Sequence, residues 1–139
     1  MRSKPLIPLV VCLLCAAACR ENSSTGPTVP LDREFTLAPG ETASIEDRGL
    51  RVQFLGVSGD SRCPADAVCI QGGDALVHIR VSGGLNSGAE YDLHTGDASR
   101  ASATHGTVAI ELVQLQPYPF SGRPIQPGDY RATLRATRP

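Results

Sequence analysis

From Phe35 onward, hydrophobic and polar residues alternate along most of the chain, which is the pattern of half-buried β-strands. The alternation is clear over residues 50–54, 75–81, 108–112 and 130–136, and weaker over 34–37, 42–45 and 89–95. No stretch repeats with the 3.6-residue period of a helix, and residues 97–105 are expected to form a loop, with a helical turn as the alternative.

Turn-forming residues separate these stretches, at positions 39–40, 47–49, 82–84 and 127–129. About seven short strands in about 100 residues predict an all-β domain over residues 34–139, an antiparallel β-sandwich of the immunoglobulin-like type. A small barrel fits the same strand count. Tyr130 follows a Gly-Asp turn, so we expect it to make a tyrosine-corner contact.

The first eighteen residues have a different pattern, that of an export signal. Arg2 and Lys4 precede an apolar stretch over residues 6–18. A helix needs about 20 residues to span a bilayer, whereas the apolar core of a signal peptide needs about 7–15, so this stretch fits the second.

Residues 13–19, which read LLCAAAC, resemble the lipobox of bacterial lipoproteins. The resemblance implies cleavage before Cys19, lipidation of its thiol with diacylglycerol, acylation of the new amine with a fatty acid such as palmitate, and anchoring to a membrane. Ala16 stands where the family favours Leu. Arg20 replaces the Asp that retains such proteins in the inner membrane, which implies an outer-membrane protein facing the periplasm or the surface. The alternative is an ordinary secretory signal cut after Ala18.

The next segment, residues 19–33, is polar and rich in Ser, Thr, Gly and Pro. Such a segment buries too little apolar surface to offset its ordering entropy. The sequence therefore predicts a signal peptide over 1–18, a flexible lipid-anchored tether over 19–33 and a β-domain over 34–139.

Charge and composition limit the partners. The chain is 41% hydrophobic and carries a net charge of −1, and without Arg2 and Lys4 the mature part holds 11 basic and 14 acidic residues. A nucleic-acid partner would require a basic excess, so none is expected. The expected partners are the membrane, through the lipid, and an envelope protein.

The cysteines sort into three groups. Cys12 and Cys15 leave with the signal peptide, and Cys19 receives the lipid. Cys63 and Cys69 remain as an even pair in an oxidising compartment, which predicts a disulfide. Closing this short loop would contribute about 2 kcal/mol to stability.

A redox pair or a metal site is the alternative for these two cysteines. Redox motifs usually read C-x-x-C, but five residues separate Cys63 from Cys69. A zinc site needs four ligands, or three and a water molecule, and His78, His94 and His105 fall on different predicted elements. We therefore expect no metal and no cofactor.

The segment from Asp60 to Pro64, followed by Cys69 and Gly73, resembles a D-S-R-C-P…C-x-W-x-G stretch of many small secreted or lipid-anchored bacterial proteins. In those proteins the stretch joins two strands of a β-domain. The resemblance covers roughly residues 35–138 and implies a fold but no activity. Gln71 stands at the usual Trp position.

Asp60 and Arg62 are candidate interaction residues, because they flank the disulfide loop. With Asp66 and Asp74 nearby, they are typical of a small recognition surface or of a calcium site. The alternative is structural: Asp60 caps a turn and pairs with Arg62.

A second candidate surface is the proline-rich stretch over residues 117–127. It holds Tyr118 and Phe120, two of only six aromatic residues. A proline-stiffened loop loses little entropy on binding, and exposed aromatic side chains are good anchors. Alternatively, both rings fold back over the end of the sandwich.

No catalytic motif stands out, so we expect a non-catalytic binding domain of the cell envelope rather than an enzyme. One alternative is an inhibitor of proteases or lysozyme that uses the loop from Arg62 to Ile70, an analogy at the level of fold. Another is a hydrolase in which Ser58 or Ser61 works with a histidine, although no G-x-S-x-G context is present.

Overall fold

The computed structural model describes residues 25–139; the predicted signal peptide and Cys19 lie outside the described residues. The strands are β1 (Thr25–Val29), β2 (Glu34–Leu37), β3 (Thr42–Ile45), β4 (Leu50–Ser58), β5 (Leu76–Gly83), β6 (Ala89–His94), β7 (Ser102–His105), β8 (Val108–Gln116) and β9 (Arg131–Thr137). Two short 3₁₀ turns, η1 (Ala98–Arg100) and η2 (Pro127–Asp129), complete the elements. Within this part of the chain, no helix has the length and hydrophobicity needed to cross a membrane.

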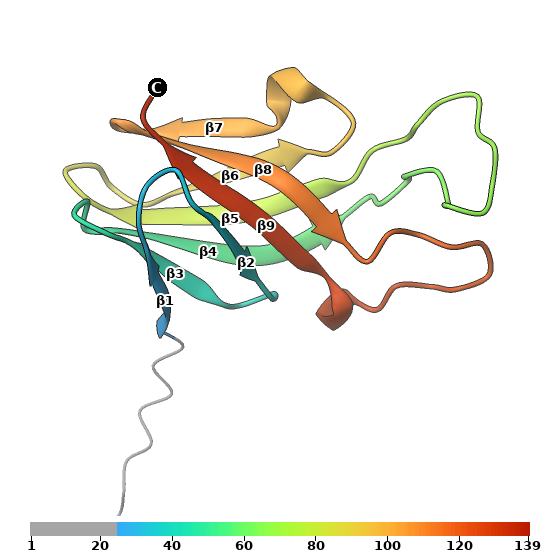
Figure 1. Ribbon diagram of the computed structural model, residues 1–139, viewed down its shortest axis with the longest axis horizontal. Coiled ribbons are helices and arrows are strands. Elements are labelled where there is room, and N and C mark those ends of the chain that lie inside the picture. The colour runs from blue at the N-terminus through green and yellow to red at the C-terminus, as the bar shows by residue number, and fades with distance from the viewer. Residues whose placement is uncertain (1–24) are drawn as a thin grey trace, which may run out of the picture.

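The strands form two layers (Figure 1). One sheet has the order β1-β3-β4-β5-β6 and the other the order β2-β9-β8-β7. Every neighbouring pair is antiparallel except β1 with β3. The predicted all-β sandwich is confirmed, and the sheets do not close into a barrel.

The core lies between the layers and comes from the alternating positions. In β5, Val77, Ile79 and Val81 are fully buried, whereas His78 and Arg80 point outward. The largest fully buried side chains come from both sheets: Leu37, Phe54, Ile79, Leu93, Ile110 and Leu134. Burial of one face fixes the register, because a one-residue slip would turn these side chains to water.

Two strands lie where the sequence predicted none. The predicted tether over residues 19–33 is wrong from Thr25 onward, because β1 pairs with β3 and Val29 is buried opposite Ile45. Gly26 permits this close approach, since a Cβ there would lie 2.1 Å from the Thr42 carbonyl oxygen. The loop expected over residues 97–105 holds η1 and β7, whose small and polar side chains hide the alternation.

Two long connections project from the same end of the sandwich (Figure 1). One joins β4 to β5 over residues 59–75 and the other joins β8 to β9 over residues 117–130. We call this the loop end. The turn between β5 and β6 and the C-terminus lie at the opposite end.

The buried place of Val29 can be tested by substitution. Val29→Ala is expected to lower the free energy of unfolding by about 1–2 kcal/mol, because two buried methyl groups are lost. The matched control is Thr28→Ala on the exposed face of β1, expected within about 0.5 kcal/mol of the wild type. Equal values for the two variants in urea unfolding would contradict the assignment of β1 to the core.

Candidate functional site

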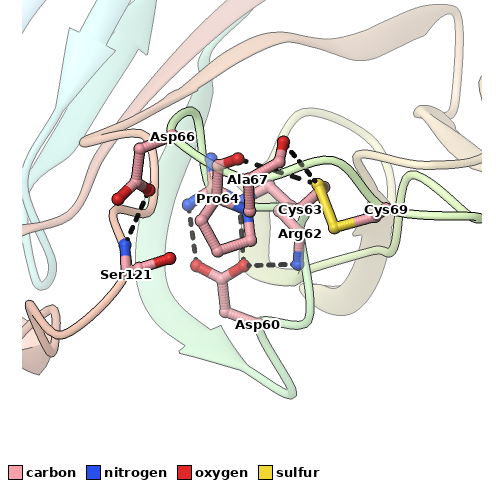
Figure 2. Close-up of a disulfide and its surroundings, with 8 residues drawn as sticks. All are labelled: Asp60, Arg62, Cys63, Pro64, Asp66, Ala67, Cys69 and Ser121. Carbon is pink, nitrogen blue, oxygen red and sulfur yellow. Dashed lines mark hydrogen bonds and ion pairs between the residues drawn. A yellow bond between two sulfur atoms is a disulfide. The ribbon is translucent and has the colours of Figure 1, made fainter.

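The first of the two loops is closed by a bond between Cys63 and Cys69, which confirms the predicted disulfide (Figure 2). Its two limbs are also joined through the backbone, by the Ser61 amide to the Asp74 carbonyl at 2.7 Å and the Cys63 amide to the Gly72 carbonyl at 2.9 Å. The limbs are so close that a Cβ on Gly73 would lie 1.8 Å from the Ser61 oxygen. The disulfide loop is therefore held at its base as well as across its tip.

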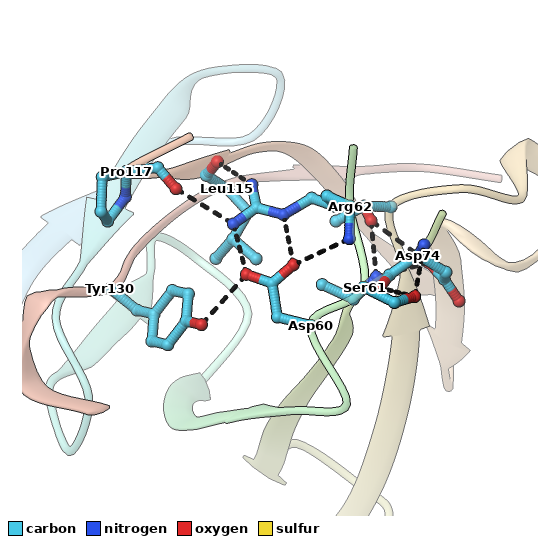
Figure 3. Close-up of polar contacts among 9 residues, drawn as sticks. Asp60, Ser61, Arg62, Asp74, Leu115, Pro117 and Tyr130 are labelled. Carbon is cyan, nitrogen blue, oxygen red and sulfur yellow. Dashed lines mark hydrogen bonds and ion pairs between the residues drawn. The ribbon is translucent and has the colours of Figure 1, made fainter. Parts of the chain in front are cut away.

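Arg62 fastens this loop to the second one (Figure 3). Its side chain is 5% exposed and donates from Nε and Nη2 to the Asp60 carboxylate at 2.8 and 2.7 Å. Nη1 and Nη2 also donate to the carbonyls of Leu115 and Pro117, at 2.8 and 3.0 Å. The Tyr130 hydroxyl donates to the same carboxylate at 3.0 Å. We call this group the Arg62 clasp.

The protonation of Asp60 fits its role in the clasp. Burial by itself raises the pKa of this carboxyl, but hydrogen bonds from Arg62 and Tyr130 outweigh burial and hold the pKa below its ordinary value of 3.8. The stability contributed by ionised Asp60 is therefore complete above about pH 4 and is lost as the pH falls through the folded-state pKa.

Two further contacts join the loops. The Ala65 amide donates to the Pro119 carbonyl at 2.9 Å, and the Ser121 amide donates to the Asp66 carboxylate at 2.8 Å (Figure 2). Together with the Arg62 clasp, these bonds make one unit of two segments that lie far apart in the sequence.

The structure thus places the candidate residues Asp60 and Arg62 inside the loop end, as a buried pair. Asp66 and Asp74 have separate partners, and no three His, Cys, Asp or Glu side chains of residues 25–139 are grouped as a metal would require. The predicted tyrosine corner differs in its partner, because the Tyr130 hydroxyl reaches a carboxylate rather than a backbone group.

Four large hydrophobic side chains are exposed at the loop end. Val68 and Ile70 on the disulfide loop are fully exposed, and Tyr118 and Phe120 on the second loop are 50% and 48% exposed. Neither ring is folded away, although Tyr118 packs on the Arg62 guanidinium with 5.3 Å between the guanidinium carbon and the ring centre. We call Val68, Ile70 and Phe120 the apolar rim.

Beside the clasp lies a groove of about 750 Å³, lined by both loops, the end of β6 and the second half of β8. Asp74 and His94 form its polar wall, with 2.5 Å between the carboxylate and Nδ1. Burial raises the pKa of Asp74, but hydrogen bonds from His94, the Gly96 amide and Thr95 bring it to about 2. Because an ionised carboxylate only accepts, Nδ1 of His94 carries the hydrogen.

His94 is the functional candidate that sequence reasoning missed. His94 lines the groove, its side chain is 11% exposed, and Nε2 has no hydrogen-bond partner within residues 25–139. The sequence placed His94 merely on a separate element from the other histidines. No signal in it links Asp74 to His94, because they meet only through the pairing of β5 with β6.

A second histidine has the contacts of a hydrolase triad. His78 accepts from or donates to the Ser58 hydroxyl at 2.7 Å through Nε2, and its Nδ1 lies 2.6 Å from Asp92. These residues lie on the outer face of the five-stranded sheet, line neither groove found in the described residues, and leave the Asp92 side chain 58% exposed. Ser61 contacts the Asp74 backbone rather than a histidine.

Because the Arg62 clasp is buried, we expect the stability of the domain to depend strongly on the Arg62 guanidinium. Arg62→Met is expected to lower the free energy of unfolding by about 3–5 kcal/mol, because Asp60 is left as a buried carboxylate without a counter-charge. The double variant Asp60→Asn/Arg62→Met should recover part of this loss. Arg51→Met, on an exposed strand position, is the control. A loss of only about 1 kcal/mol for Arg62→Met, as for a surface ion pair, would contradict the clasp.

Comparisons with known proteins give no information about this site. No protein-family model and no curated protein matches the sequence, and no solved structure matches the fold. The chemistry of the loop end is therefore inferred from the contacts described above.

Proposed function

We propose that this protein is an exported lipoprotein whose β-domain binds a protein of the cell envelope through the apolar rim. The observation that carries the proposal is the full exposure of Val68 and Ile70 on a loop closed by a disulfide and fastened by the Arg62 clasp. Exposed apolar side chains on a preorganised loop lose little entropy when they bind, which favours a binding role over a purely structural one.

The lipid anchor rests on the sequence, namely the export signal and Cys19. The fold is compatible with it, because the described chain begins at β1, along one edge of the five-stranded sheet and away from the loop end (Figure 1). An anchor that precedes β1 leaves the rim free for a partner. We place the protein at the outer membrane, facing the periplasm or the surface.

A non-catalytic role accords with the charges at the loop end. Arg62 is neutralised by Asp60, and Asp74 is bonded to His94. These side chains are engaged in holding the loops and the groove wall.

The second candidate function is inhibition of a protease. A convex loop with a fixed backbone and fully exposed aliphatic side chains, Val68 and Ile70, matches the shape of a side-chain pocket that prefers small apolar residues. In this case the rim would enter an enzyme cleft rather than a flat partner surface.

The anchor is tested by the intact mass of the protein purified from membranes. We expect a chain that begins at Cys19 and carries acyl groups, and Cys19→Ser should release the domain from the membrane fraction. A form that lacks residues 1–18 but carries no lipid would refute the anchor and leave an ordinary secreted protein.

The rim is tested by capture from envelope extract with the soluble Cys19→Ser form as bait. Val68→Asp/Ile70→Asp is expected to lose the captured partner, because two charges would be buried in the interface. Leu85→Asp is the matched control, since Leu85 is equally exposed but lies at the opposite end of the sandwich. Capture that survives the double substitution, or its loss in the Leu85 variant, would refute the rim. Inhibition of proteases that cleave after small aliphatic residues, abolished by the same double variant, would favour the second candidate.

A further inference from the structure

The groove beside the Arg62 clasp has a different chemistry from the rim. Its wall combines one aromatic ring, two side-chain amides and an oriented histidine, from Tyr118, Gln71, Gln114 and His94. We propose that this groove binds an uncharged sugar chain. This inference goes beyond the proposed protein partner, because it concerns another surface and another class of ligand.

Tyr118 supplies a fixed platform for a sugar ring. The Arg62 guanidinium covers one face of the aromatic ring at 5.3 Å, and half of the side chain remains exposed at the groove. Arg62 is itself held by four hydrogen bonds to Asp60, Leu115 and Pro117. A ring held in this way loses little freedom when the apolar C–H face of a sugar packs on its open side.

The polar atoms of the groove suit hydroxyl groups. Nε2 of His94 has no hydrogen-bond partner among the described residues, and Asp74 fixes the orientation of its ring. Since Nδ1 carries the hydrogen, Nε2 is an acceptor, and a ligand hydroxyl can donate to it in place of a water molecule. The side-chain amides of Gln71 and Gln114 have no partners among the described residues and offer both donors and acceptors.

The charges of the groove indicate that the ligand is neutral. Arg62 is paired with Asp60 at 2.7 Å, and the Asp74 carboxylate accepts hydrogen bonds from His94, Thr95 and the Gly96 amide. No other charged residue lines this groove. An anionic ligand would meet a guanidinium that is already paired with Asp60 and uses four of its five N–H donors, and a cationic one would compete with His94 for Asp74.

The size of the groove agrees with a short oligosaccharide. Its volume of about 750 Å³ falls in the range of about 300–1,000 Å³ that is usual for ligand sites. It is open to solvent rather than enclosed, so a longer chain can extend past the domain. A soluble oligosaccharide and a strand of wall polysaccharide present the same chemistry to such a groove.

The experiment is isothermal titration of the soluble Cys19→Ser form with neutral hexasaccharides: cellohexaose, chitohexaose and maltohexaose. An acidic oligogalacturonate serves as the charged comparison. We expect at least one neutral chain to bind. Tyr118→Ala should weaken it about 10-fold or more, and Gln114→Ala by up to about 10-fold. Tyr118→Phe keeps the ring and should stay close to the wild type.

Leu85→Ala, at the opposite end of the sandwich, is the control variant. Unfolding temperatures of all variants separate lost binding from lost structure. Three results would overturn the proposal: no neutral hexasaccharide binds, Tyr118→Ala binds as well as the wild type, or the acidic chain binds best. Sedimentation with purified cell-wall polysaccharide then distinguishes a wall strand from a free oligosaccharide. If the apolar rim captured no protein, the sugar-binding results would be unchanged. The proposal of a protein partner and the proposal of a sugar ligand can therefore fail independently.

Discussion

The buried guanidinium of Arg62 is the interaction on which the loop end depends. A cation taken out of water costs several kcal/mol unless its donors and its charge are satisfied. Asp60 supplies the charge, and the carbonyls of Leu115 and Pro117 take the remaining donors that point inward. Asp60 also accepts a hydrogen bond from the Tyr130 hydroxyl. The pair of Arg62 with Asp60 therefore fixes the relative position of the strands β4, β8 and β9 and of both loops.

This interaction explains why an exposed apolar rim can persist on a small domain. Val68 and Ile70 make no core contact that would hold their loop in place. The loop instead derives its shape from the disulfide, the bond from Ala65 to Pro119 and the Arg62 clasp. Residues that were candidates for direct recognition, Asp60 and Arg62, therefore act by holding other side chains in position, and the rim they support is apolar.

The features predicted from the sequence are those set by local patterns. Alternation located seven of the strands, and cysteine parity located the disulfide. β1 was missed because its segment is polar and forms a strand only by pairing with the edge of β3. This pairing is a tertiary contact that the local sequence pattern does not show. The pair of Asp60 with Arg62 was the structural alternative that the sequence offered, and it is confirmed. The contact between Asp60 and Tyr130 spans 70 residues and leaves no period in the sequence, so it could not be predicted.

Two aspartate–histidine pairs in one sheet show how burial separates similar residues. His78 with Asp92 lies on an open, solvated face and uses both ring nitrogens, so it is explained as a polar ladder between neighbouring strands. His94 with Asp74 lies at the edge of a groove, nine-tenths buried, with one nitrogen left over. The first pair has no ring nitrogen left for a ligand, because both are bonded within the sheet. Only His94 keeps a ring nitrogen without a protein partner beside a groove, although the sequence presents the two histidines alike.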